Sequence, residues 1–225
     1  MAIRLGTLDP PAFRVGTITP TRIFQGNSLV WPPYTETTQI FATVGSSVYD
    51  IPANCRFIDI VLLGGGGGGA GGNNANGDGQ GGEPSVFVTR TLVRGIDIPW
   101  SVTQITVTVG AGGTAGAGGV GSGGPGGTTS VSTVTGFTLS SVGGTGGVGT
   151  NPFQGTTPIG DGVTPVTFNG ILYQGGSSVG SANPSAVGAN GNAPGGGAEG
   201  GGGRIIQQGF GGGTGGRGQA WLRAY

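Results

Sequence analysis

The side chains that most enzymes use for catalysis are scarce in this sequence. Histidine and lysine are absent, and nine arginines balance nine aspartates and glutamates. Without histidine, Ser–His–Asp and Cys–His catalysis and histidine metal sites are excluded. The nearest carboxylate pairings, Asp50 with Asp59 and Asp78 with Glu83, are interpreted as solvated turn residues. Carboxylates distant in sequence can still meet in a glycosidase site, but the sequence favours a protein that is not an enzyme and needs no cofactor or metal.

Runs of glycine such as Gly64–Gly69 raise the alternative of a phosphate-binding loop. The Walker pattern ends in lysine followed by serine or threonine, and this chain has no lysine. Matches to GxGxxG arise by chance at this glycine content, and none opens a helix within a βαβ unit. The formal net charge is zero, so no basic surface is available to neutralise a phosphate backbone. We therefore expect neither a nucleotide nor a nucleic-acid partner.

Glycine and proline dominate the composition. The chain contains 57 glycines and 14 prolines, which together exceed the roughly 25–30% that usually signals low complexity or disorder. The glycine blocks nevertheless alternate with segments rich in valine, isoleucine, threonine and phenylalanine, which favour strands. Because ordering glycine costs more backbone entropy than ordering any other residue, a dense hydrogen-bond network or burial against partner subunits must compensate. We expect ordered glycine segments and a homo-oligomer, with a trimer favoured.

A residue period of two predicts an all-β chain. In the segment 55–63, the even-numbered residues Arg56 to Leu62 fall on one face of a strand and the odd-numbered residues Phe57 to Leu63 on the other. No window sustains helical periodicity. The expected body is a β-sandwich or jelly-roll-like domain. The further predicted strands are Gln39–Val44, Ser85–Val93, Thr103–Val109, Thr128–Thr135, Phe137–Val142, Thr164–Phe168, Ile171–Gln174 and Gln219–Tyr225.

The glycine blocks have a period of three. Glycine recurs at every third residue through 110–119, in a second register through 118–127, and again in 143–149 and 209–218. This period matches the polyproline II helix, which has three residues per turn and no internal hydrogen bonds. Its N–H and C=O groups are free to bond to neighbours, and glycine lets the backbones approach closely. We expect a bundle of short polyproline II helices, with irregular but ordered loops as the alternative.

The first 35 residues differ from the rest and are interpreted as an N-terminal docking arm, followed by a glycine-rich β domain over residues 36–225. Thr21–Phe24 and Ser28–Trp31 predict a small β-hairpin turning at Gly26. An isolated hairpin is marginal in water, so the arm should dock on the body or on a neighbouring protein. The residues expected to make this assembly contact are Phe13, Arg14, Phe24 and Trp31.

Residues 150–175 form the longest interruption of the glycine blocks. Aromatic and amide side chains on loops are suited to stacking against sugars or gripping a partner. A small satellite hydrophobic cluster is the alternative interpretation of the aromatic residues. The candidate receptor-contact residues are Asn151, Phe153, Gln154, Phe168 and Tyr173.

The chain shows no sign of export or membrane insertion. Met1–Phe13 contains no apolar core of a secretory signal. The longest strongly apolar run, Phe57–Leu63, is far shorter than the roughly 20 residues that span a bilayer as a helix. We expect synthesis in the cytoplasm. The single cysteine, Cys55, excludes an intrachain disulfide and is expected to be an inert, partly buried small residue.

The segment Phe41–Gly69 resembles the opening of glycine-rich domains in phage tail proteins, in which an extended Tyr-x-Ile/Val-Pro strand precedes a β-strand that ends in polyglycine. Residues 12–33, and Arg22–Trp31 above all, resemble the short N-terminal arm of minor tail proteins from phages of actinobacteria. Later elements similar to the same domain are Ile105–Gly113, Gly126–Val131, Leu139–Gly147 and Gly218–Tyr225.

This resemblance implies a glycine-rich minor tail protein or tail-tip adhesin of a siphovirus-like bacteriophage. Such a protein would be made in the host cytoplasm and would lie in the virion, at the tail tip. Its implied partners are other tail-tip proteins and a host cell-surface glycan or protein. The alternatives are a purely structural virion decoration or plug subunit and a cellular surface adhesin.

Overall fold

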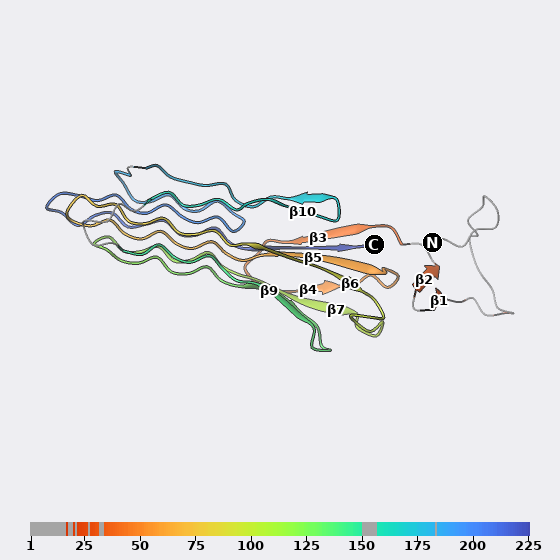
Figure 1. Cartoon of the computed structure of the whole chain (residues 1–225). Coiled ribbons are helices and arrows are strands. Elements are labelled where there is room, and N and C mark those ends of the chain that lie inside the picture. The colour runs from red at the N-terminus through yellow and green to blue at the C-terminus, as the bar shows by residue number, and fades with distance from the viewer. Residues whose placement is uncertain are drawn as a thin grey trace.

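The computed structural model describes residues 17, 20, 22–26, 28–31, 34–149, 157–182 and 184–225, with only the backbone of residues 28–31. Over these residues the secondary structure consists of strands, turns and extended chain, with no helix. Figure 1 shows an elongated molecule with the strands gathered at one end and undulating glycine-rich segments running side by side toward the other. We call these the strand end and the glycine bundle. No helix that could cross a membrane occurs in the described part of the chain.

Two antiparallel four-stranded sheets form the strand end, with strand orders β3-β12-β5-β6 and β4-β7-β8-β9. The first sheet consists of β3 (Thr37–Phe41), β12 (Gln219–Ala224), β5 (Phe57–Leu63) and β6 (Phe87–Val93). The second consists of β4 (Gly45–Asp50), β7 (Gln104–Val109), β8 (Thr129–Ser132) and β9 (Thr138–Ser141). Two separate hairpins join β1 (Ile23–Gln25) to β2 (Ser28–Trp31) and β10 (Val166–Phe168) to β11 (Ile171–Tyr173). The all-β, sandwich-like body predicted from the sequence is confirmed.

The core lies between the two sheets and follows from the alternation predicted for residues 55–63. Ile58, Ile60 and Leu62 are fully buried and belong to the same cluster as Ile105 and Val107 of the other sheet. Each such side chain contributes on the order of 1.5–3 kcal/mol to folding by leaving water. The opposite face of β5 is also buried, so this strand has a hydrophobic layer on both sides.

The second layer is a smaller group that we call the outer cluster. Its buried members are Val61, Leu63, Val163, Tyr173 and Trp221. The hairpin β10–β11 supplies its cover, because partly buried side chains from both of its strands pack on this cluster. Asn169 and Gly170 form the two-residue turn of that hairpin with φ angles of 46° and 79°. An Asn-Gly turn of this kind matches the twist of paired strands.

One predicted strand was wrong in extent. A single strand was expected over Gln39–Val44, but β3 ends at Phe41 and the chain passes into the other sheet, where β4 begins at Gly45. Gly45 has a φ of 109°, a conformation that residues with a side chain rarely adopt. β4 opens on this glycine, a residue with weak strand propensity, so the sequence pattern missed the strand.

Most strands continue directly into the glycine bundle, and the continuation of β5 is its centre. Every backbone N–H from residue 65 to residue 73 donates to another segment, in strict rotation among three antiparallel neighbours. Gly65, Gly68 and Gly71 donate to the segment 121–127. The next residue of each triplet donates to the segment 210–216 and the third to the segment 77–83.

Carbonyl groups of the same central segment accept from three parallel neighbours, again with a period of three. Gly66, Gly69 and Gly72 accept from Gly113, Gly116 and Gly119, which is one of the registers seen in the sequence. The other two sets of carbonyls accept from the segments 144–147 and 198–204. The central segment is thus bonded to six surrounding segments and makes no internal bond. This period of three and this lateral bonding define polyproline II packing and confirm the bundle predicted from glycine spacing.

Glycine is required in this bundle because the backbones are in contact. A Cβ atom added to Gly67 would overlap the carbonyl oxygen of Thr145, and one added to Gly69 would overlap that of Glu199. The atoms in the way are backbone, which cannot rotate aside as a side chain does. These segments have few hydrophobic side chains to bury. The backbone hydrogen bonds and the close backbone contacts therefore stabilise their ordered conformation.

Candidate functional site

The described part of the N-terminal arm meets the body at Trp100. The Phe24 ring lies edge-on to the Trp100 ring with 5.2 Å between centroids, and the Arg22 guanidinium lies 5.4 Å from the same ring. Phe24 still exposes 41% of its surface. Of the predicted docking residues, Phe24 therefore contacts the chain's own body. Phe13, Arg14 and the Trp31 side chain lie outside the described residues.

A buried arginine, Arg94, also contacts Trp100. Arg94 lies 4.9 Å from the Trp100 ring and donates to the backbone oxygens of Trp100 and Val102, both at 2.9 Å. It also approaches the Cys55 sulfur at 3.8 Å. Burial raises the pKa of the Cys55 thiol. Cys55 is fully buried rather than partly buried as expected, because it lies in the core where β5 begins.

The described candidate receptor-contact residues lie in the outer cluster. Tyr173 is 5% exposed and meets Trp221 edge-on with 5.6 Å between ring centroids. Phe168 is partly buried against the same cluster. Burial raises the pKa of the Tyr173 hydroxyl. In this arrangement both rings are packing residues, which favours the satellite-cluster interpretation for these two. Asn151, Phe153 and Gln154 lie outside the described residues.

A buried carboxylate fixes the hairpin β10–β11 to the sheet. Asp59 is 1% exposed, and its Oδ1 accepts from Thr91 Oγ1 at 2.6 Å and Asn169 Nδ2 at 2.8 Å. The Tyr225 hydroxyl donates to the same oxygen at 3.2 Å. Arg223 Nη1 lies 3.3 Å from Oδ2. The buried charge is therefore balanced by one cation and several donors, as such a charge requires.

This arrangement corrects the interpretation of Asp59 as a solvated turn residue. The side chain lies on the outer face of β5 and is covered by the hairpin turn. Arg223 also pairs with a second carboxylate, that of Glu36, which is exposed. The hydrogen bond that Arg223 donates to it at 2.6 Å lowers the pKa of the Glu36 carboxyl.

No group of three or more metal-ligating side chains occurs among the residues that the structure describes.

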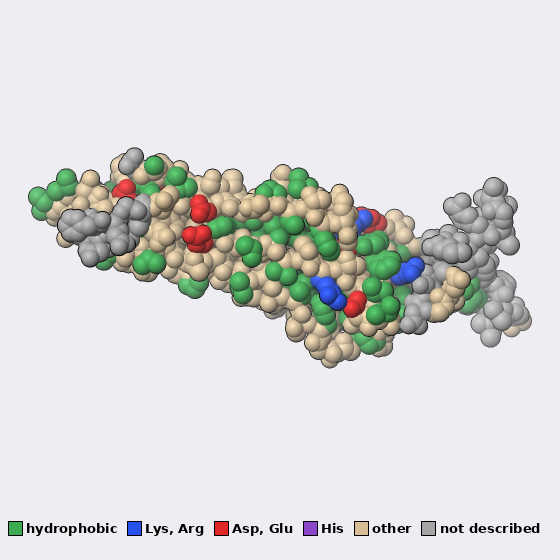
Figure 2. Space-filling model, in the orientation of Figure 1, with side chains coloured by type: hydrophobic (Ala, Val, Ile, Leu, Met, Phe, Trp, Pro, Cys, Tyr) green, Lys and Arg blue, Asp and Glu red, His purple; other side chains and the backbone are tan. Residues whose placement is uncertain are grey.

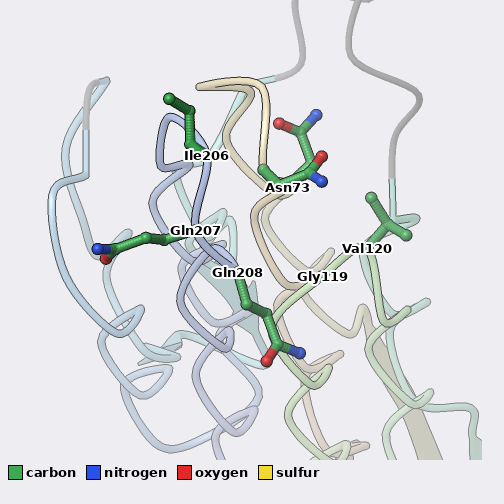
Figure 3. A pocket seen from close by; sticks show the side chains of 7 residues that line it. Asn73, Gly119, Val120, Ile206, Gln207 and Gln208 are labelled. Carbon is green, nitrogen blue, oxygen red and sulfur yellow. The ribbon is translucent and has the colours of Figure 1, made fainter.

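At the far end of the glycine bundle, three turns surround a hollow of about 340 Å³ (Figure 3). The turns come from residues 73–77, 118–121 and 203–209, which connect the segments of the bundle. The hollow is lined by Asn73, Asn74, Gly119, Val120, Ile206, Gln207 and Gln208. No charged side chain is among these residues.

A second hollow at this end has charged walls. It has a volume of about 380 Å³ and includes Asp78, Arg204 and Phe210 in its lining. The Arg204 guanidinium stacks on the Phe210 ring at 4.0 Å, and Asp78 Oδ1 accepts from the backbone N–H of Gly203 at 2.9 Å. On the face drawn in Figure 2, charged side chains are sparse along the bundle. Sequence reasoning missed both hollows, because their residues come from turns far apart in the chain.

Comparison with known proteins identifies the family. Residues 42–225 match the family model described as a glycine-rich domain, and the chain belongs to this family. The chain is 42% identical over 214 residues to the gene 32 protein of Mycobacterium phage D29. This alignment covers 93% of this chain and 92% of that protein. It is 47% identical over 92 residues to the gene 32 protein of Mycobacterium phage L5, covering 41% of this chain and 42% of that protein. These relatives place the chain among phage proteins.

Proposed function

We propose that this chain is a minor tail protein at the tail tip of a phage particle, where it stabilises the tip and contacts the host surface. The observation that carries this proposal is the glycine bundle, in which the central segment forms hydrogen bonds to six surrounding segments. Such a scaffold holds its connecting turns in fixed positions, so little conformational entropy is lost when they bind a surface. The phage relatives supply the biological setting.

The two ends of the molecule suit different partners. The described part of the arm contacts Trp100 at the strand end, and the turns with the two hollows lie at the opposite end. We infer that residues 1–35 attach the chain to other tail-tip proteins and that the bundle points away from the particle. This orientation would present the turns to the host.

The test is a truncation of residues 1–35. The truncated protein should fold, as measured by its circular dichroism and melting curve, yet be absent from purified particles when these are analysed by mass spectrometry. Electron microscopy of particles carrying the tagged full-length chain should place the tag at the tail tip. A truncated chain that enters particles normally, or a tag found on the capsid, would contradict the proposal.

A purely structural subunit without host contact is the second candidate. It is favoured by apolar side chains that are exposed at several places on the described surface, including Ile40, Val86 and Val142 at 56%, 63% and 63%. Burial of such residues against further copies would also support the proposed trimer. Light scattering on the purified protein measures the oligomeric state, and a monomer at all concentrations would contradict the trimer.

A further inference from the structure

We propose that the uncharged hollow at the far end of the bundle is a binding site for a neutral saccharide. This inference rests on the proposed host-contact function and specifies its ligand class. The hollow lies between turns that the bundle holds in place, and its volume of about 340 Å³ is within the usual range of small-molecule sites. Figure 3 shows side chains from separate turns around it.

The lining has the chemistry that a sugar ring requires. Asn73, Asn74, Gln207 and Gln208 supply four primary amides, a group with two N–H donors on its nitrogen and a carbonyl acceptor. Gln208 Nε2 already donates to the Gly118 carbonyl at 2.7 Å, which holds this side chain against the turn at residues 118–121 and leaves its carbonyl oxygen for a ligand. Sugar hydroxyls are likewise both donors and acceptors. Val120 and Ile206 supply aliphatic surface, which suits the C–H face of a pyranose or furanose ring. A charged ligand would find no counter-charge in this lining, so a neutral one is favoured.

One of these amides has an unused donor. Asn73 Oδ1 accepts from the backbone N–H groups of Ala75 and Gly77 at 2.8 and 2.7 Å, which fixes the orientation of the amide. Its Nδ2 is buried and has no hydrogen-bond partner among the described residues. A buried donor without a partner is costly, and a ligand hydroxyl would satisfy it. Because water does not reach this atom, binding requires a small movement of the turn at residues 73–77.

The aliphatic residues are held in a conformation that β-branched side chains avoid. Val120 has a φ of 69° and Ile206 a φ of 67°, in the left-handed region that is unfavourable for such residues. Ile206 is also 92% exposed, so burial of its side chain does not compensate for the strain. Strained residues of this kind concentrate at binding sites, where the strain serves to position a side chain.

The experiment is a titration of the full-length ¹⁵N-labelled protein with neutral disaccharides of glucose, galactose, mannose and arabinose, followed by NMR. Binding should shift the side-chain amide signals of Asn73, Asn74, Gln207 and Gln208 in a saturable manner. The signal of Gln39, which lies on β3 at the strand end, should not move. Absence of saturable shifts at the tip with every sugar, or equal shifts at Gln39, overturns the proposal.

Two variants separate binding from folding. The double variant Asn74→Ala/Gln207→Ala changes exposed side chains and should weaken binding about tenfold or more with an unchanged melting temperature, a loss that corresponds to about 1.4 kcal/mol. Ile206→Gly relieves the unfavourable φ and should weaken binding without lowering the melting temperature. The matched control is Gln39→Ala. Variants that bind as tightly as the parent protein overturn the site.

Binding to whole host cells distinguishes the source of the ligand. Oxidation of the cells with periodate, which cleaves sugar diols, should abolish attachment of the labelled protein, whereas protease treatment should not. The reverse result assigns a protein receptor and overturns the saccharide. Mass spectrometry of purified particles tests the tail-tip function separately: a chain absent from particles refutes that function, whatever the sugar titration shows.

Discussion

The side-chain amide of Asn169 donates a hydrogen bond of 2.8 Å to the carboxylate of Asp59, although 110 residues separate them. Asn169 forms the turn of the hairpin β10–β11, and Asp59 lies in the middle of β5. The bond fixes the hairpin over the outer cluster and thereby buries Tyr173 against Trp221. A polar contact thus fixes the position of the hairpin whose apolar side chains cover the outer cluster.

Replacement Asp59→Asn should lower the free energy of unfolding by about 2–4 kcal/mol, because it removes the charge that pairs with Arg223 and replaces an acceptor by a donor in a buried network. Urea denaturation measures the change. The control is Asp50→Asn at an exposed carboxylate that accepts from Gln104 Nε2 at 2.8 Å, which should cost less than about 0.5 kcal/mol. Equal losses at the two positions would refute the role of Asp59.

Adjacent glycines in the bundle should differ sharply in their tolerance of a methyl group. A Cβ at Gly212 would overlap the backbone carbonyl of Gly69 in the central segment, whereas the nearest atom to a Cβ at Gly211 is the Gly116 oxygen at 3.1 Å. We expect Gly212→Ala to destabilise by more than about 3 kcal/mol and Gly211→Ala by about 1 kcal/mol or less. Melting curves of both variants compare them directly, and similar melting temperatures would show that the bundle is not closely packed.

Tyr49 should make the protein sensitive to alkali. Its hydroxyl is buried without a hydrogen-bond partner among the described residues, and burial raises its pKa well above the ordinary value of 10.0. The pKa of Tyr49 is higher in the folded state than in the unfolded state. Its contribution to stability is therefore fully present below about pH 10, the unfolded-state value, and is lost as the pH rises toward the folded-state value. Burial also raises the pKa of Tyr173 and Tyr225, which adds to the loss over the same range.

The variant Tyr49→Phe should therefore keep or increase stability at neutral pH, by about 1 kcal/mol, since it removes an unpaired buried hydroxyl. It should also lose less stability than the parent protein between about pH 9 and about pH 11, a range that spans the ordinary tyrosine pKa of about 10. Denaturation across this range measures both effects. Tyr34→Phe is the control, because its hydroxyl is paired with Thr37 Oγ1 at 2.6 Å and is exposed. A loss of stability at neutral pH in Tyr49→Phe would contradict this account.

The arm contact at Trp100 should be measurable as a coupling between two rings. A double-mutant cycle of Phe24→Ala and Trp100→Ala should give a coupling of about 0.5–1.5 kcal/mol, the usual range for an edge-to-face pair. Phe87→Ala combined with Trp100→Ala provides the comparison, because Phe87 packs on Trp221 instead and should not couple. A coupling near zero for Phe24 would mean that the arm does not rest on the body in solution.

Much of the strand end was predictable, because the alternation of apolar side chains along a strand indicates which of its faces are buried. Alternation along residues 55–63 predicted two faces, and the structure buries them in two different hydrophobic clusters. The Asp59 network was not predictable, since an aspartate within an apolar run gives no indication of which donors will meet it. Its partners Asn169 and Arg223 come from elements that only the fold brings together.

The sequence by itself determined that glycine recurs with a period of three and that strands alternate with these blocks, and both features are present in the structure. It could not determine which glycine block lies beside which. Glycine has no side chain, so a glycine block contains no residue that would favour one neighbouring block over another. The strands decide this: β5 leads into the central segment, and the sheets set the position from which each other segment begins. The hollow between residues 73 and 208 exists only because that arrangement brings distant turns together at the end of the bundle. Backbone hydrogen bonds then hold the segments in register, since each N–H and C=O of the closely packed chains must find a partner away from water.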